Sequence, residues 1–348
     1  MHVIVIGAGI IGAAIALRLA QRGHRVSVID SGAPGATAAS FGWINASFHL
    51  TPEHYHLRAE GIAAWHRLTP LLGESVTWQG CLWWEELGPK LQAFAAQLQR
   101  LGYPVERRAP DLPMLAAPPG EALFFPAEGI AAPAATRDAL LALATGQGAQ
   151  VLRGMAVQAV ETEAGRVTGI RTDAGRVAAD HVVIAAGTGA PDLLHDLGLA
   201  LPMLPRPGLM LRSSPVPVLD IPILCTPQGE VRQGADGCLW ASAAVGHQAD
   251  DATTIADAMD SAQTAAARIG ALFQDPPARW DEVRLAWRPM PGDGLPVIGA
   301  ADPQGLSVAV MHSGITLAAI TAEILADEIT TGARRNDLTP FRPERFLA

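Results

Sequence analysis

Cysteine is scarce in this sequence of 348 residues, and its three cysteines form no motif. Cys81, Cys225 and Cys238 lie far apart, with no CxxC pair and no spacing typical of a metal site. This usage excludes a disulfide framework and predicts reduced thiols, as in a cytosolic protein. We also expect no metal centre.

Runs of basic residues and long apolar runs are missing as well. The formal net charge is −9, and no basic run provides a footprint for nucleic acid or for an anionic membrane surface. Every stretch of about 18 residues contains a polar break, so we expect no membrane span. A first strand expected from residue 3 leaves no room for a signal peptide. The sequence therefore predicts a soluble cytoplasmic protein.

Hydrophobic residues, by contrast, make up 49% of the chain, and charged residues only 17%. This composition supplies ample material for buried layers, and a chain of this length is typical of about two domains.

The most specific motif follows the first expected strand. Residues 3–6 (VIVI) lead directly into residues 7–12 (GAGIIG), after which an apolar helix is expected. This order is typical of a dinucleotide-binding unit. In such a unit Gly7 permits the turn, Gly9 lets the backbone approach a pyrophosphate, and Gly12 lets the helix pack on the strand. The first N–H groups of the helix and its positive dipole end favour phosphate.

An acidic residue stands where this motif requires one. The expected strand at 26–29 ends in Asp30, about twenty residues after the turn, where a carboxylate accepts hydrogen bonds from an adenosine ribose. A loop of small residues follows at 31–40. Such a loop cannot fill a core by itself, and it can lie close against a ligand.

The remaining periodicity predicts both helices and antiparallel strands. Helices are expected at 54–68, 90–101, 137–146, 254–271 and 315–330. Strands are expected as a pair within 75–87, as a meander after residue 151, as a buried strand at 181–187, as antiparallel sheet over 208–245, and at 283–287 and 307–311.

Three segments that are far apart in the sequence are expected to share one sheet: the nucleotide motif, the buried strand before Gly187 and the final strand–helix unit. They can do so only if their domain is discontinuous. We therefore expect an α/β Rossmann-like domain formed by residues 1–50, 127–205 and 286–348. A second, α+β substrate domain with a mainly antiparallel sheet is expected from residues 51–126 and 206–285.

Several segments, in this order, together resemble the D-amino-acid oxidase superfamily. They are the glycine motif, the small-residue loop, residues 128–133 (EGIAAP), the meander ending in residues 185–187 (AAG), residues 288–299 (RPMPGDGLPVIG) and residues 312–318 (HSGITLA). Within the superfamily the sequence looks most like the glycine oxidase, sarcosine oxidase and D-amino-acid dehydrogenase branch. The resemblance spans nearly the whole chain and is weakest at 75–125 and 208–280.

The resemblance implies FAD as the cofactor. It implies non-covalent binding, because branches with covalent flavin carry a cysteine just before the segment that here holds Met290 and Pro291. At the nucleotide end, the resemblance places Ile10 and Ile11 at the pyrophosphate, Asp30 and Ser31 at the ribose, Val157 at the adenine, and Gly187 where the nucleotide site closes. Along the ribityl chain and the isoalloxazine it places Thr37, Ser40, Phe41, Gly42 and Trp43. Beside the flavin pyrimidine it places His312, Ser313, Gly314, Ile315 and Thr316. The N-terminus of the final helix would stabilise negative charge on the reduced flavin.

The activity implied is oxidation of the C–N bond of a small amino acid or secondary amine, such as a D-amino acid or a glycine-, sarcosine- or proline-like compound. Hydride transfer to the flavin would be followed by release or hydrolysis of the imine. The electron acceptor would be oxygen or an electron-transfer partner. Arg288 matches the carboxylate-binding arginine of the family, and a guanidinium fork fits a carboxylate in two parallel bonds. The alternative for Arg288 is a structural ion pair with Asp293.

Other candidates are weaker. His312 belongs to the final motif, and His49 follows the flavin loop and is a candidate for substrate contact. His54 and His56 begin a helix, where we expect them to be solvated. No arginine follows His312, and only two tyrosines exist, so carboxylate recognition is expected to be looser than in relatives, with Arg232 as a further candidate. Core packing is the favoured interpretation of the tryptophans that could instead wall the pocket, Trp43, Trp83 and Trp84.

Three alternatives have different functions. The chain could be the flavin-bearing subunit of a heteromeric amine or imino-acid dehydrogenase that needs a partner for activity. A tRNA-modifying relative is disfavoured by the net charge of −9. An NAD-linked dehydrogenase would purify without yellow colour.

Overall fold

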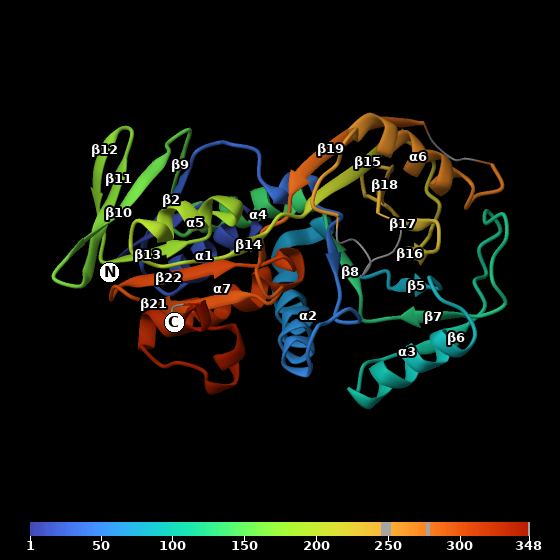
Figure 1. Cartoon of the computed structure of the whole chain (residues 1–348), viewed down its shortest axis with the longest axis horizontal. Coiled ribbons are helices and arrows are strands. Elements are labelled where there is room, and N and C mark those ends of the chain that lie inside the picture. Colours follow the sequence, from blue (N-terminus) through green and yellow to red (C-terminus); the bar gives the residue numbers. More distant parts are fainter. Residues whose placement is uncertain (245–251, 276–278, 347–348) are drawn as a thin grey trace.

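The computed structural model describes residues 1–244, 252–275 and 279–346, so residue 245, at the end of the expected antiparallel region, lies outside the described residues. Two large sheets lie at opposite ends of the molecule, and helix α2 (Pro52–Leu72) stands between them (Figure 1).

The first sheet has six strands in the order β21-β22-β13-β1-β2-β9, parallel except where β21 meets β22. Its strands come from three separated stretches of chain: β1 (His2–Ile6), β2 (Arg25–Asp30), β9 (Gln150–Arg153), β13 (His181–Ile184), β21 (Val297–Ala301) and β22 (Leu306–Val310). The central strand β1 therefore has one neighbour close in sequence and one far away. This arrangement confirms the expected α/β Rossmann-like architecture, while the domain boundaries stay a prediction.

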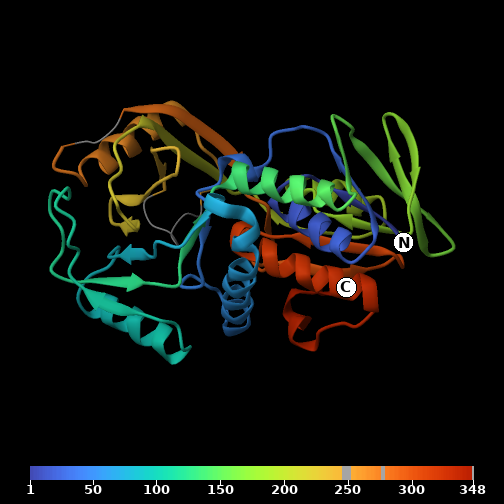
Figure 2. The same cartoon turned by 180° about the vertical axis from the view of Figure 1, so that it is seen from behind.

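Both faces of this sheet are covered, which explains the continuous apolar run of β1. Val3 and Val5 pack into the layer formed by α1 (Ile10–Gln21), α4 (Pro133–Gly146) and α7 (Gly314–Thr331), where α1 contacts both other helices (Figure 2). Ile4 and Ile6 face the opposite way, toward α5 (Ala190–His195) and the three-stranded meander of β10 (Val157–Glu163), β11 (Arg166–Thr172) and β12 (Gly175–Ala178).

The second sheet has eight strands in the order β19-β15-β18-β17-β16-β5-β7-β6, antiparallel except between β16 and β5. Its strands are β5 (Cys81–Trp83), β6 (Glu106–Arg108), β7 (Ala122–Phe125), β15 (Pro207–Pro215), β16 (Ile223–Thr226), β17 (Gly229–Gln233), β18 (Cys238–Ser242) and β19 (Trp280–Trp287). The helices α3 (Pro89–Arg100) and α6 (Ala258–Gly270) accompany it.

Two small sheets join the halves. One consists of β3 (Trp43–Ile44), β8 (Gly129–Ala131) and β4 (Val76–Thr77), and the other of β14 (Met203–Leu204) and β20 (Met290–Pro291). The predicted strand pair within 75–87 is wrong, because β4 pairs with β8 whereas β5 pairs with β7 and β16. The expected helices are present with shifted ends, as in α2.

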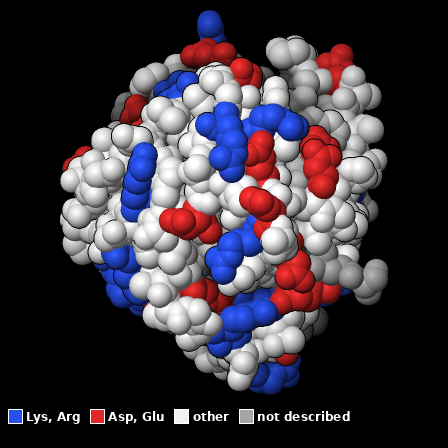
Figure 3. Space-filling view, turned by 90° about the vertical axis from the view of Figure 1, so that its left-hand side faces the viewer, with Lys and Arg blue, Asp and Glu red and all other residues white. Residues whose placement is uncertain are grey.

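Charged side chains of both signs are interspersed on the face shown in Figure 3. In the part of the chain that the structure describes, no helix is both long and apolar enough for a bilayer. The three cysteines are buried and free.

Candidate active site

The glycine turn after β1 is packed so closely that two of its positions admit no side chain. Gly7 has φ +103°, and a Cβ there would lie 2.5 Å from the backbone oxygen of Ala185. A Cβ on Gly12 would lie 1.9 Å from the oxygen of Gly7. Gly9 has space in front of it, since its nearest neighbour would be Thr37 Oγ1 at 3.3 Å. The turn thus brings the backbone at the start of α1 close to open space.

Asp30 fastens this turn to the end of β2. Its carboxylate accepts hydrogen bonds from the backbone N–H of Ala8 at 2.7 Å and of Gly32 at 2.9 Å. On the opposite side, Thr37 Oγ1 accepts from the N–H of Ile10 at 3.1 Å. The small-residue loop is therefore attached to the first turn of α1.

A cavity of about 670 Å³ opens over this turn. It is lined by most of the residues that the sequence predicted for the nucleotide: Gly7, Gly9, Ile10, Ile11, Asp30, Ser31, Thr37, Ser40, Val157, Gly187, His312, Gly314 and Ile315. Gly12 lies beneath the turn and serves packing instead.

A second cavity, of about 680 Å³, is lined by residues of the eight-stranded sheet, of α2 and of the start of α7, and shares Ser40, His312 and Ile315 with the first. The other predicted residues that line it are Phe41, Gly42, Trp43, His49, Arg288, Ser313 and Thr316. Residues far apart in sequence are thus brought together along one continuous site.

Helix α7 begins at the boundary of the two cavities. Ser313 is its N-cap residue but makes no side-chain cap bond, so the first N–H groups are not satisfied in that way. Thr316 Oγ1 donates to the oxygen of Trp43 and accepts from the N–H of Asn45, both at 3.2 Å. Trp65 Nε1 donates to the carbonyl of Ile315 at 2.8 Å. These bonds fix the positive end of the helix beside the cavities.

Arg58 is a functional candidate that sequence reasoning missed. It lies on α2, is 4% exposed and lines the second cavity. Its guanidinium donates to both oxygens of Asn45 and to Ser313 Oγ. Burial lowers the pKa of Arg58 to about 10, so it stays charged at neutral pH. The available signal was a charged residue at helical spacing on the apolar face of α2.

Arg288 lies in the wall of the second cavity just after β19. Its Nε donates to the carbonyl of Arg206 at 3.3 Å and its Nη2 to that of Pro207 at 2.8 Å, which orient the guanidinium. Asp293, the alternative partner, forms an ion pair with Arg345 at 2.7 Å. Arg288 therefore lies in the cavity wall, the place that the predicted carboxylate role requires.

The histidines differ from one another. His49 lines the second cavity, and burial lowers its pKa. His56 is exposed as expected, but the prediction of a solvated His54 is wrong: this side chain is 4% exposed because Phe341 near the C-terminus packs on it. Burial, followed by the charge of Arg58, lowers the pKa of His54 to about 3.

Arg232 is not a wall residue of either cavity, which corrects its candidacy as a ligand. It is 1% exposed, and its Nε donates to the carbonyl of Phe41 at 2.5 Å. Arg232 therefore holds the backbone at Phe41 in place without facing a cavity. Trp83 and Trp84 are buried in packing, as favoured, whereas Trp43 also lines the second cavity. Among the described residues, no group of three or more His, Cys, Asp or Glu is arranged to hold a metal ion.

A glycine turn, an acidic residue at the end of β2 and two adjoining cavities define a dinucleotide-binding enzyme. The family model described as FAD dependent oxidoreductase matches residues 2–328, and the chain belongs to this family. FAD is the cofactor of the family. The residues fit it here, because the glycine turn admits a close backbone approach and the second cavity continues from the first.

Individual relatives agree with this assignment. The chain is 28% identical to a glycine oxidase of Pseudomonas putida, with 99% of each chain covered. It is also 28% identical to a D-amino acid dehydrogenase of Rhizobium johnstonii, covering 99% of this chain and 100% of the relative. The crystal structure of L-proline dehydrogenase from P. horikoshii has a TM-score of 0.87 at 20% identity, covering 99% and 97% of the two chains, and so shares the fold.

Proposed function

We propose that this chain binds FAD non-covalently along the two cavities and oxidises the C–N bond of a small amino acid or secondary amine. The observation that carries the proposal is the position of Arg288, an oriented guanidinium in the same cavity wall as Trp43 and the start of α7. The names of the relatives, glycine oxidase and D-amino acid dehydrogenase, support this substrate class.

The predicted cofactor contacts follow the cavities. The turn at 7–12 and the start of α1 would hold the pyrophosphate, Asp30 and Ser31 the ribose, and Val157 and Gly187 the adenine end. The loop carrying Thr37, Ser40, Phe41, Gly42 and Trp43, together with residues 312–316, would enclose the ring system. The three cysteines line neither cavity, which supports a dissociable cofactor.

When bound, FAD supplies a two-electron acceptor for the hydrogen on the carbon next to nitrogen. The protein contributes orientation and charge. Arg288 would bind the substrate carboxylate in a bidentate manner and thereby fix the reacting carbon. The start of α7 and the buried charge of Arg58 make this end of the cavity favourable for negative charge.

His49 and His312 are the candidate catalytic imidazoles in this cavity. The amine must lose a proton before oxidation, and His49 lies in the cavity wall as a candidate to accept it, although burial lowers the pKa of its imidazole. We expect His49→Ala to slow cofactor reduction at neutral pH more than at a pH above the pKa of the substrate amine. An equal effect at both pH values would remove His49 from this role.

The test of the function is anaerobic mixing of the purified yellow protein with D-amino acids, N-methyl amino acids and prolines. Loss of the visible flavin absorption with one class identifies the substrate. Admitting air then distinguishes an oxidase, which recovers its colour, from a dehydrogenase, which needs another acceptor. A protein that takes up no FAD contradicts the proposal.

The heteromeric alternative predicts a different outcome of the same experiment. A flavin-bearing subunit would retain FAD but would not be reduced by any amine until a second protein is added.

A further inference from the structure

Glu128 is a fully buried carboxylate that no cofactor or substrate contact requires. It immediately precedes β8, is 0% exposed and lines neither cavity. Its Oε2 accepts from Trp43 Nε1 at 2.7 Å, and its Oε1 accepts from Ser47 Oγ at 2.5 Å and from the hydroxyl of Tyr103 at 2.9 Å. These three partners are neutral, although a buried carboxylate is costly unless its charge is balanced.

The balancing charge is that of Arg58, on the other side of residues 43–47. Trp43 and Ser47 of this segment bond to Glu128, whereas Asn45 between them bonds to the guanidinium of Arg58. The two charges act on each other, since Glu128 raises the pKa of Arg58 and Arg58 lowers that of Glu128. The segment that forms part of the second cavity wall is therefore held between a carboxylate and a guanidinium.

Few other groups near Glu128 titrate. Burial raises the pKa of Glu128 to about 7 against its hydrogen bonds and Arg58. The groups that face it are Arg58 on α2, Tyr103 after α3 and Cys81 on β5. Burial keeps the pKa of Tyr103 and of Cys81 well above its usual value, so both stay neutral around pH 7.

We propose that Glu128 is a positioning residue of the cofactor and substrate site, which holds Trp43 in the cavity wall and balances the charge of Arg58 across residues 43–47. This inference rests on the proposed function, because it concerns how the same site is held and charged. Glu128 acts through Trp43 and Arg58, and itself touches neither cofactor nor substrate.

The charge has a measurable consequence. Replacing Glu128 by glutamine leaves Arg58 unbalanced at the edge of the second cavity, beside the start of α7. Because the reduced cofactor carries more negative charge than the oxidised one, the reduced form gains stability. At a pH above the pKa of Glu128, where the wild-type carboxylate is ionised, we expect the equilibrium to shift about tenfold toward the reduced form, which is about 30 mV for a two-electron couple.

The experiment compares FAD-loaded wild type, Glu128→Gln and Glu128→Asp by their midpoint potentials and by the dissociation constant of acetate. Glu128→Asp keeps the charge but shortens the reach to Trp43, so its potential should match wild type while acetate binds at least threefold more weakly. Glu128→Gln should raise the potential. The matched control is Glu328→Gln, which removes the charge of another buried carboxylate, bonded to Arg342 at the far end of α7.

Equal potentials and equal acetate binding in Glu128→Gln and Glu328→Gln would overturn the inference. If Glu128→Gln does not fold, Tyr103→Phe removes only one hydrogen-bond donor to the Glu128 carboxylate. We expect ionisation of Glu128 to lower the potential of the wild type as the pH rises, and this step should move to higher pH in Tyr103→Phe. If the step lies at the same pH in Tyr103→Phe and in the wild type, the inference is also overturned. If the wild type binds no FAD, both the proposed function and this inference are refuted. If the wild type binds FAD but the Glu128 variants do not differ from it in potential or in acetate binding, only the inference is refuted.

Discussion

At the scale of single residues, Arg288 and His181 show how backbone partners and burial set the behaviour of an ionisable side chain. Two carbonyls accept hydrogen bonds from Arg288 and help to orient its guanidinium. His181 on β13 lies against Ser307, with 2.9 Å between its Nε2 and the hydroxyl oxygen. Arg288 concerns ligand binding, and His181 concerns stability.

We expect Arg288→Ala to retain FAD but to bind carboxylate ligands roughly 10- to 100-fold more weakly, since hydrogen bonds to charged groups contribute about 1.5–3 kcal/mol. Titration of the holoenzyme with acetate measures the loss. Arg206→Ala, whose guanidinium donates to Pro205 at 3.4 Å, tests whether any nearby arginine has the same effect. Unchanged acetate binding in Arg288→Ala would exclude it from the site.

Acid should destabilise the protein partly through His181. Burial lowers its pKa from 6.5 to about 4, so the folded state binds the proton less readily than the unfolded state. This contribution to stability is complete above pH 6.5 and is lost as the pH falls toward 4, by roughly 3 kcal/mol at most. Urea unfolding between pH 7 and 4 should show a smaller loss for His181→Gln than for wild type. Parallel curves for the two proteins would contradict this account.

At the scale of elements, the site is made by the ends of two helices. Helix α1 begins after the glycine turn, and α7 begins after His312, both at cavity walls. The N-cap residues of the two helices, Gly9 and Ser313, make no side-chain cap bond, although Thr37 Oγ1 accepts from the first N–H of α1. Uncapped N-termini are suited to bind an anion from outside the helix.

Gly9→Val should abolish FAD retention while leaving a folded protein. Gly9 has φ −68° and ψ 177°, which valine tolerates, but its side chain would project into the first cavity. The ratio of visible to ultraviolet absorbance after purification measures retention. Gly146→Ala, at the end of α4 with no atom near its Cβ position, is the folded and yellow control. A yellow Gly9→Val protein would refute the placement of the pyrophosphate.

The sequence predicted those parts of the site whose determinants are local. The spacing of Gly7, Gly9 and Gly12 and the position of Asp30 depend on one strand–helix–strand unit, and their pattern is legible without a structure. The link between Glu128 and Arg58 could not be predicted from the sequence, because it runs through residues 43–47 of a third segment. The prediction that His54 is solvated was wrong for the same reason, because Phe341, nearly 290 residues later in the chain, packs on its ring.

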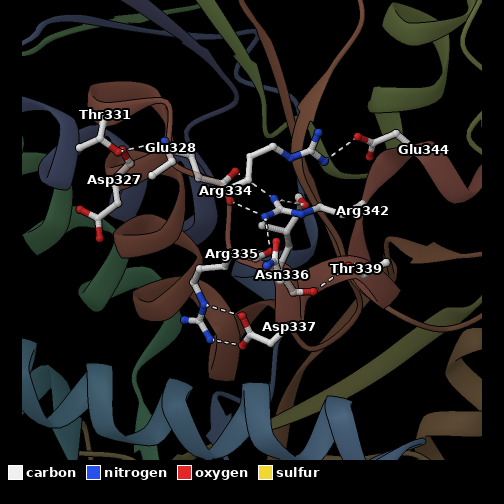
Figure 4. A network of polar contacts seen from close by, with 12 residues as sticks. Asp327, Glu328, Thr331, Arg334, Arg335, Asn336, Asp337, Thr339, Arg342 and Glu344 are labelled. Atoms are coloured by element: carbon white, nitrogen blue, oxygen red, sulfur yellow. Dashed lines mark hydrogen bonds and ion pairs between the residues drawn. The ribbon is translucent and has the colours of Figure 1, made fainter.

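At the scale of the whole molecule, the C-terminal segment, residues 332–346, forms ion pairs with several other elements. Figure 4 shows the polar contacts of this segment near the end of α7. Arg342 makes a bidentate pair with Glu328 on α7, and Arg335 makes one with Glu60 on α2. Arg345 pairs with Asp293 in the wall of the second cavity. The segment thus connects both large helices of the site to its rim.

Arg342→Ala should destabilise the protein by about 3–5 kcal/mol, because it leaves the buried carboxylate of Glu328 without its partner. The flavin absorption spectrum of the folded fraction should not change. Arg334→Ala, which removes an exposed pair with Glu344, should cost less than about 1 kcal/mol. Chemical unfolding of both variants measures the difference, and similar losses would contradict the special role of the buried pair.

The strand order of the first sheet also affects how the chain folds during its synthesis. Strand β1 is flanked by β2 and by β13, and β13 begins 175 residues after β1 ends (181 − 6). At synthesis rates of about 5–20 residues per second, one edge of β1 waits roughly 10–35 s for its neighbour. During that interval one edge of β1 is unpaired, so we expect the flavin site to form only after β13 and the start of α7 have been synthesised.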